Sequence, residues 1–118
     1  MEKTTKYKWH KIAESESELN FASNNLLELE VAGKKICIAK GTHLYACTAK
    51  CPHAGGSIAD GYIDQIDNVT CPLHRYKFSL QNGRNISGEG YYLKTFPVQT
   101  TSDGIFIGIE EKGLFPFM

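Results

Sequence analysis

The chain has 118 residues, of which 42% are hydrophobic and 22% charged, a balance typical of one globular domain with its own core. Its 13 basic and 13 acidic residues give a formal net charge of zero, which argues against a nucleic-acid-binding protein, because such proteins need a basic excess to neutralise phosphates. No apolar run approaches the length of a membrane span, and the opening residues MEKTTKYKWHKIAES lack the apolar core of a secretory signal, so we expect a cytoplasmic protein that does not enter a membrane.

Short alternating runs of apolar and polar residues, separated by Gly, Asn and Asp, predict an all-β fold. The first such run is residues 7–12, in which we expect Trp9 to be a core aromatic. Residues 14–18 are acidic and polar, which indicates a solvated connection or at most one helical turn. A three-stranded meander is predicted over residues 26–47, where Leu27, Leu29 and Val31 alternate with glutamates and Gly33 supplies a turn.

Residues 57–83 contain further turn and strand signals. We expect a turn, a polar hairpin tip, a strand with alternating apolar residues, and a two-residue hairpin turn, in that order. The residues that carry these signals are Asp60-Gly61 in the turn, Asp64, Asp67 and Asn68 at the tip, Tyr76, Phe78 and Leu80 in the strand, and Asn82-Gly83 in the hairpin turn.

The last part of the chain predicts a closing pair of strands, 91–98 and 105–110, joined by a turn at 102–104. Pro97 has no N–H for a ladder, so we place it at a sheet edge or a strand end. The apolar tail, residues 114–118, either packs back on the fold or forms a patch for a partner or a second copy.

Two short motifs carry the chemical information. The first is Cys51-Pro52-His53-Ala54-Gly55-Gly56 and the second is Cys71-Pro72-Leu73-His74, with 17 residues between His53 and Cys71. Two thiolates and two imidazoles form a four-ligand metal site, which suits tetrahedral zinc or an iron–sulfur centre with His in place of Cys on one iron. We expect the ligands to lie at the tips of two β-hairpins that face each other.

The C-x-H and C-x-x-H pairs, with Pro after each Cys and Gly-Gly after the first His, closely resemble the Rieske [2Fe–2S] family, and the resemblance covers residues 26–110. It implies a Rieske-type fold over one domain, residues 1–118, with a cluster-binding subdomain at about 47–80. It also implies one [2Fe–2S] cluster per chain, with Cys51 and Cys71 on one iron and His53 and His74 on the other.

The same resemblance implies a low-potential, oxygenase-associated ferredoxin: a one-electron carrier, without enzymatic activity of its own, between a flavin-containing reductase and a terminal oxygenase or similar acceptor. The alternatives are a small accessory subunit of a larger reductase, such as nitrite reductase, and a structural zinc module. Respiratory members carry an extra cysteine in each ligand loop, but Leu73 occupies that place in the second loop here. They also place a hydroxyl where this chain has Phe78, which predicts a potential at the low end of the Rieske range, on the order of −150 mV.

Two further features lie close to the motifs. Cys37 and Cys47 are flanked by apolar residues, and we expect buried thiols, with a disulfide between them as the alternative. Lys50, Arg75 and Lys77 flank the motifs and form either a docking patch for a partner or ordinary solvated charge.

Overall fold

A computed structural model of the protein describes residues 6–52, 56–72, 75–87 and 92–110. Strands make up nearly all of its regular structure, and no α-helix occurs within these ranges, which confirms the all-β prediction. The elements are β1 (Tyr7–Ala13), η1 (Glu16–Glu18), β2 (Leu26–Val31), β3 (Lys34–Lys40), β4 (Leu44–Thr48), η2 (Ile58–Asp60), β5 (Tyr62–Ile63), β6 (Asn68–Thr70), β7 (Lys77–Ser79), β8 (Thr95–Phe96), β9 (Val98–Thr101) and β10 (Gly104–Glu110).

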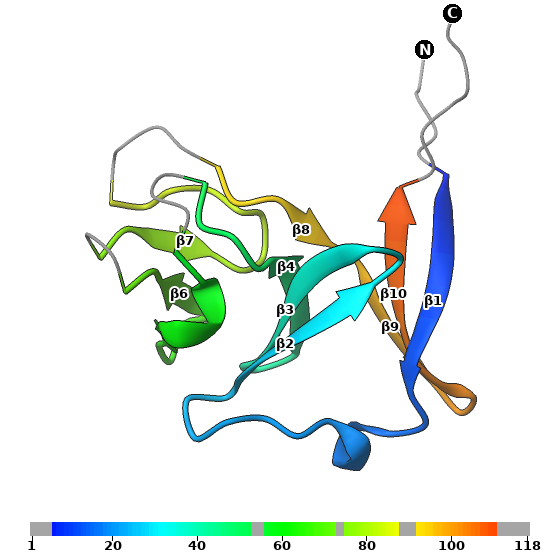
Figure 1. The fold of residues 1–118 in the computed structure, drawn as a ribbon. Coiled ribbons are helices and arrows are strands. Elements are labelled where there is room, and N and C mark those ends of the chain that lie inside the picture. The colour runs from blue at the N-terminus through cyan, green and yellow to red at the C-terminus, as the bar shows by residue number, and fades with distance from the viewer. Residues whose placement is uncertain (1–5, 53–55, 73–74, 88–91, 111–118) are drawn as a thin grey trace, which may run out of the picture.

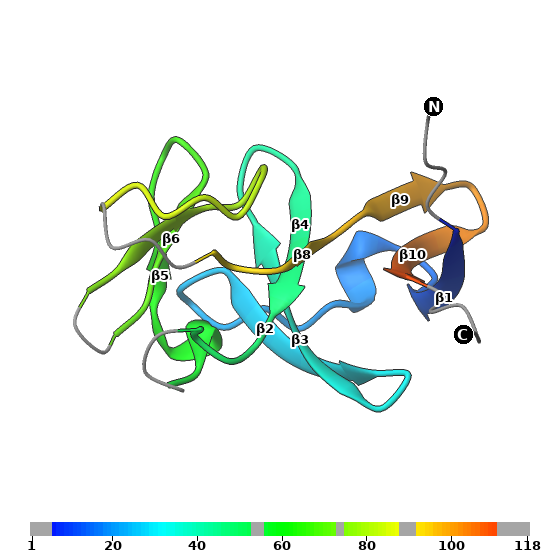
Figure 2. The same cartoon turned by 90° about the horizontal axis from the view of Figure 1, so that it is seen from above.

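The strands form three antiparallel sheets, with the orders β1-β10-β9, β2-β3-β4-β8 and β5-β6-β7. The four-stranded sheet lies between the other two (Figures 1 and 2). The β1-β10-β9 sheet forms the base of the molecule. The β5-β6-β7 sheet is at the opposite end, and Cys71, the first residue of the second motif, directly follows β6.

The meander predicted over residues 26–47 is present as β2, β3 and β4. A tight turn joins β2 to β3, and its central residues Ala32 and Gly33 have φ angles of 53° and 79°. Positive φ at both central positions is the geometry that fits the twist of a two-residue hairpin. Residues 14–18, expected to form a solvated connection or at most one helical turn, contain the three-residue 3-10 helix η1.

The closing strand pair differs from the prediction. Of the predicted strand 91–98, the described residues 92–98 do not form one strand along β10. Thr95–Phe96 pairs with β4 as β8, and Val98–Thr101 pairs with β10 as β9. Pro97 stands between the two strands, as expected of a residue that cannot donate to a ladder. The chain therefore passes from the central sheet to the base sheet at this proline.

Trp9 is not a core residue, contrary to the sequence prediction. It is 39% exposed and lies on β1 opposite Gly108, with its ring centroid 5.9 Å from that of Tyr7. Ile107 and Ile109 of β10 pack in the core, and they pair with His10 and Lys8 of β1. Paired residues point to the same face of a sheet and successive residues to opposite faces, and Trp9 stands between these two positions. Trp9 consequently lies on the outer face.

Two apolar cores fill the molecule, and β3 contributes to both. Ile36 and Ile38 pack in the core next to the base sheet, while Cys37 and Ala39 pack in the core next to β6 and β7. This split follows from the period of two in a strand that is covered on both faces. The central sheet is therefore a shared wall between the base and the end that carries the two motifs.

Within the described ranges, no helix is long and apolar enough to cross a membrane. The apolar tail at 114–118 lies outside the described residues, so its expected packing stays a prediction.

Candidate metal centre

Each motif begins at the base of a narrow loop. In the first, Lys50 and Ser57 form an isolated antiparallel bridge, and the Cys51 N–H donates to the Gly56 carbonyl at 2.7 Å. In the second, β6 and β7 form a hairpin, and the Cys71 N–H donates to the Tyr76 carbonyl at 2.8 Å. The second loop is thus the predicted hairpin, whereas the first is closed by a single bridge and continues into η2.

Cys51 and Cys71 lie in the same apolar core although 20 positions separate them in the sequence. Their exposed fractions are 2% and 0%, and Phe78, Val69 and Ile58 belong to the same core. His53 and His74, the predicted imidazole ligands, lie outside the described residues, as do Ala54 and Gly55. The described ranges accordingly contain no group of three metal-ligating side chains. Two buried thiols from separate loops fit one half of the predicted donor set.

Backbone contact joins the exit of the first loop to the entry of the second. A β-carbon added to Gly61 would lie 1.9 Å from the carbonyl oxygen of Thr70, which directly precedes Cys71. Asn24 fixes this segment from the side of β2, because its amide nitrogen donates to the carbonyls of Ala59 and Gly61, both at 2.9 Å. The sequence analysis missed Asn24. Its position in a polar turn directly before β2 was the one feature that could have indicated a structural role.

Asp67 was predicted at a polar hairpin tip, and the structure places it there but buries it to 4% exposure. Its carboxylate accepts hydrogen bonds from the Thr42 N–H at 2.9 Å, from the Thr42 hydroxyl, and from the Tyr45 hydroxyl at 2.7 Å. Desolvation by burial acts to raise the pKa of Asp67, but these hydrogen bonds outweigh it and the pKa is lowered. The ionised carboxylate thus ties the β3–β4 turn to the β5–β6 turn.

The hairpin turn predicted at Asn82-Gly83 is present, but with a longer loop than expected. Gly83 has a φ of 78°, as the Asn82-Gly83 signal requires, but Ser79 and Arg84 close the turn around four residues and not two. Gly83 also accepts the Leu93 N–H at 2.8 Å, so this turn is held against the segment that leads into β8.

Cys37 and Cys47 face each other across β3 and β4 and are fully buried. None of the four cysteines, all within the described ranges, forms a disulfide, which confirms the expectation of buried thiols. A hydrogen bond with Cys37, followed by burial, raises the pKa of Cys47 well above its usual value.

Comparison with known proteins agrees with these features. The sequence profile of the Rieske [2Fe-2S] domain matches residues 8–97. The ferredoxin subunit of 3-phenylpropionate/cinnamic acid dioxygenase from Escherichia coli K12 is 33% identical over 72 residues, which are 60% of this chain and 68% of that protein.

Solved structures share the fold. A chain in the complex of reduced oxygenase and oxidised ferredoxin of carbazole 1,9a-dioxygenase superposes on this protein with a TM-score of 0.73. The two chains are 22% identical, and the match covers 88% of this chain and 95% of that one. A protein assigned as the small subunit of an NADH-dependent nitrite reductase from Mycobacterium tuberculosis matches with a TM-score of 0.74 and 14% identity, over 92% and 98%. From the profile match and the paired cysteine loops together, the chain belongs to the Rieske [2Fe–2S] domain family.

Proposed function

We propose that this protein is a one-electron carrier in which Cys51 and Cys71 hold one iron of a Rieske [2Fe–2S] cluster and His53 and His74 hold the other. The observation that carries the proposal is the convergence of two buried cysteines, from loops far apart in the sequence, on one apolar core. The cluster supplies reversible one-electron chemistry, and its potential is higher than that of an all-cysteine cluster because imidazole ligands carry no charge.

The residues around the cysteines determine how many hydrogen bonds the cluster sulfurs can accept. Phe78, fully buried on β7 opposite Val69, presents a ring without a hydrogen-bond donor to the shared core. Fewer donors toward the sulfurs leave added negative charge less stabilised, which supports a low potential.

We further propose that the carrier takes its electron from a flavin-containing reductase and delivers it to a terminal oxygenase. The relative that is 33% identical is a ferredoxin subunit of a dioxygenase, which supports this assignment. The likeness to a nitrite reductase small subunit has 14% identity and concerns the fold alone. Constant association with a large reductase on size-exclusion chromatography would favour that second candidate.

The same proposal treats residues 1–118 as one Rieske-type domain that works in the cytoplasm. Buried thiols at Cys37 and Cys47, directly opposite and not oxidised, suit a reducing compartment.

The test compares Cys51→Ala with Cys47→Ala, since both cysteines are buried in the same core but only Cys51 is a proposed ligand. We expect wild type and Cys47→Ala to contain two irons per chain and to give, after dithionite reduction, an EPR spectrum with average g below the free-electron value. Cys51→Ala and His74→Ala are expected to lose this signal. Full iron content in Cys51→Ala, or a colourless wild type that holds one zinc after anaerobic reconstitution with iron and sulfide, would contradict the proposal.

A further inference from the structure

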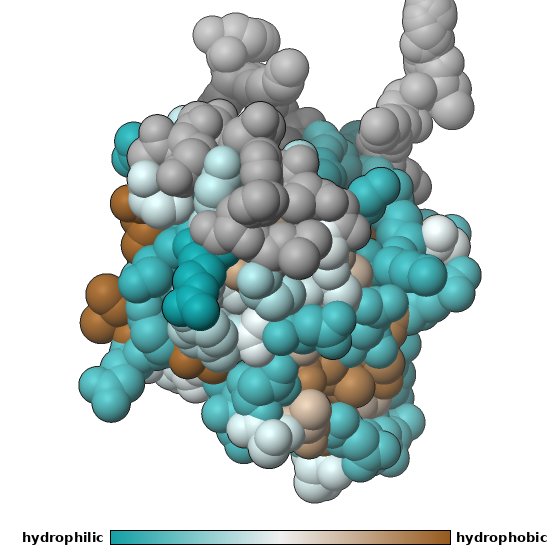
Figure 3. Space-filling view, turned by 60° about the vertical axis from the view of Figure 1, so that its left-hand side comes forward, coloured by the Kyte–Doolittle hydropathy of each residue, from teal (hydrophilic) through white to brown (hydrophobic). Residues whose placement is uncertain are grey.

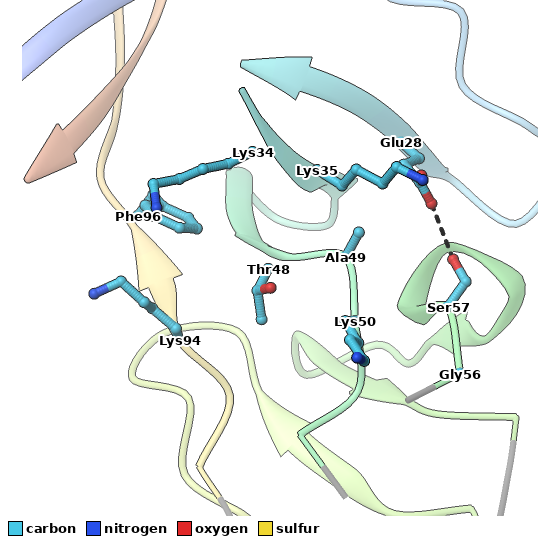
Figure 4. A pocket seen from close by; sticks show the side chains of 10 residues that line it. All are labelled: Glu28, Lys34, Lys35, Thr48, Ala49, Lys50, Gly56, Ser57, Lys94 and Phe96. Atoms are coloured by element: carbon cyan, nitrogen blue, oxygen red, sulfur yellow. Dashed lines mark hydrogen bonds between the residues drawn. The ribbon is translucent and has the colours of Figure 1, made fainter. Parts of the chain in front are cut away.

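A groove of about 500 Å³ runs alongside the base of the first ligand loop. One wall comes from the start of β3, a second from the stretch between β4 and η2, and a third from the segment around β8, as Figure 4 shows. The lining residues are Glu28, Lys34, Lys35, Thr48, Ala49, Lys50, Gly56, Ser57, Lys94 and Phe96. Because Lys50 directly precedes Cys51 and Gly56 accepts its N–H, the groove shares a wall with the loop that holds a cluster ligand.

The rim of the groove is strongly basic. Four lysines line it against a single carboxylate, Glu28, whereas the whole chain has no formal net charge. Lys35 extends toward Glu28, which itself accepts the Ser57 hydroxyl at 3.1 Å (Figure 4). Within the described ranges, only Lys94 of the four forms an ion pair, with Glu110 at 3.6 Å. The groove therefore presents an excess of positive charge, in which Lys34 and Lys50 have no carboxylate partner within the described ranges.

The interior of the groove is less polar than its rim. Ala49 and Phe96 are both buried, with 3% and 8% of their surface exposed, and the Lys94 ammonium lies 5.8 Å from the centroid of the Phe96 ring. Figure 4 shows Lys34 extending from β3 toward the same ring. Carboxylates on the rim lysines, with one apolar side chain against Phe96, would match this arrangement.

Other surfaces are less specific. At the end of the molecule that carries β5, β6 and β7, hydrophobic residues occur in separate groups between hydrophilic ones (Figure 3). Lys77, one of the cations that flank the motifs, lies 3.8 Å from Asp64 and is partly compensated. Four lysines, by contrast, gather on the groove beside the first loop, which we call the lysine groove, and charge complementarity points to it as the docking surface.

We propose that the lysine groove docks an acidic segment of the redox partner protein, with carboxylates on Lys34, Lys35, Lys50 and Lys94 and an apolar side chain on Phe96. The inference rests on the proposed electron-carrier function and adds the chemistry of the partner surface. Docking there places the partner against the loop that begins at Cys51. Opposite charges at such a rim raise the association rate and fix the orientation of the two proteins.

The probe is a dye-labelled, blocked pentapeptide with two glutamates on each side of one phenylalanine, titrated with the oxidised holoprotein and followed by fluorescence anisotropy at low salt. We expect Lys34→Gln and Lys50→Gln each to weaken binding about 3-fold, as for an exposed ion pair, and 0.5 M salt to remove the difference. The matched control is Lys8→Gln, which removes an exposed lysine of β1 that does not line the groove and that, like Lys34 and Lys50, forms no ion pair within the described ranges. Its affinity should equal that of wild type.

Equal weakening by Lys8→Gln would show non-specific attraction and overturn the proposal, as would the absence of saturable binding. Free glutamate that competes at the same carboxylate concentration as the peptide would overturn it too, because the groove would then be a small-anion site. The EPR spectrum of the same samples separates the two claims: an intact mixed-ligand signal without peptide binding refutes only the groove, whereas a missing signal refutes the electron carrier.

Discussion

Replacing Gly61 by alanine should disturb the metal centre through the backbone, without touching a ligand. Gly61 has a φ of −90°, so it does not occupy the left-handed region that favours glycine. The added methyl carbon, however, would lie 1.9 Å from the Thr70 carbonyl oxygen. That is about 1.5 Å closer than the distance at which non-bonded atoms attract.

Because Thr70 precedes Cys71, the relief of this overlap has to move the entry of the second ligand loop or the exit of the first. Backbone atoms cannot rotate away as a flexible side chain does, and overpacking of this kind costs about 1–3 kcal/mol or more. We therefore expect Gly61→Ala to lower the free energy of unfolding by at least 2 kcal/mol, at the upper part of that range, and to reduce iron content.

Gly33→Ala is the matched control. Gly33 has a φ of 79° and no atom within 4 Å of an added β-carbon, so alanine there costs about 1–2 kcal/mol of backbone strain without any clash. Urea unfolding and iron analysis on both variants test the reasoning: Gly33→Ala should keep two irons per chain and an unchanged EPR spectrum. Full iron content in Gly61→Ala, with stability equal to that of Gly33→Ala, would refute the steric argument.

Two further predictions concern residues in or beside the same core. Asp67→Asn should lower the free energy of unfolding at pH 7 by about 2–3 kcal/mol, since it removes the charge that accepts hydrogen bonds from Thr42 and Tyr45. Because the pKa of Asp67 is lowered in the folded protein, this contribution to stability is present above the unfolded pKa of about 4 and is lost as the pH falls through the folded pKa. The urea unfolding curves of wild type and variant should therefore converge in acid. A stability difference that stays constant with pH would contradict the assignment. Phe78→Tyr should raise the reduction potential, because a hydroxyl from β7 would donate into the core shared with Cys51 and Cys71; an unchanged midpoint in a redox titration would mean that this ring does not face the cluster.

The sequence alone predicts the donor set and determined most of the strand order. The ligand motifs are short, so the spacing of Cys51, His53, Cys71 and His74 is readable without any knowledge of distant contacts. The alternation of apolar and charged residues predicted the meander β2–β4, because the carboxylate-rich face of β2 has to point to solvent. Trp9 was misplaced because alternation identifies the two faces of a strand but not the face that is covered.

Tertiary structure decided the features that depend on partners far away in the chain. The run at 91–98 divides at Pro97 because β4 is available to pair with Thr95–Phe96, a contact that no local pattern encodes. Asp67 is buried because Thr42 and Tyr45 approach it from another turn, and Gly61 matters because Thr70 lies against it. The lysine groove has the same origin: its cations come from three separate segments of a chain with no net charge, so their sum becomes visible only when folding places them on one rim.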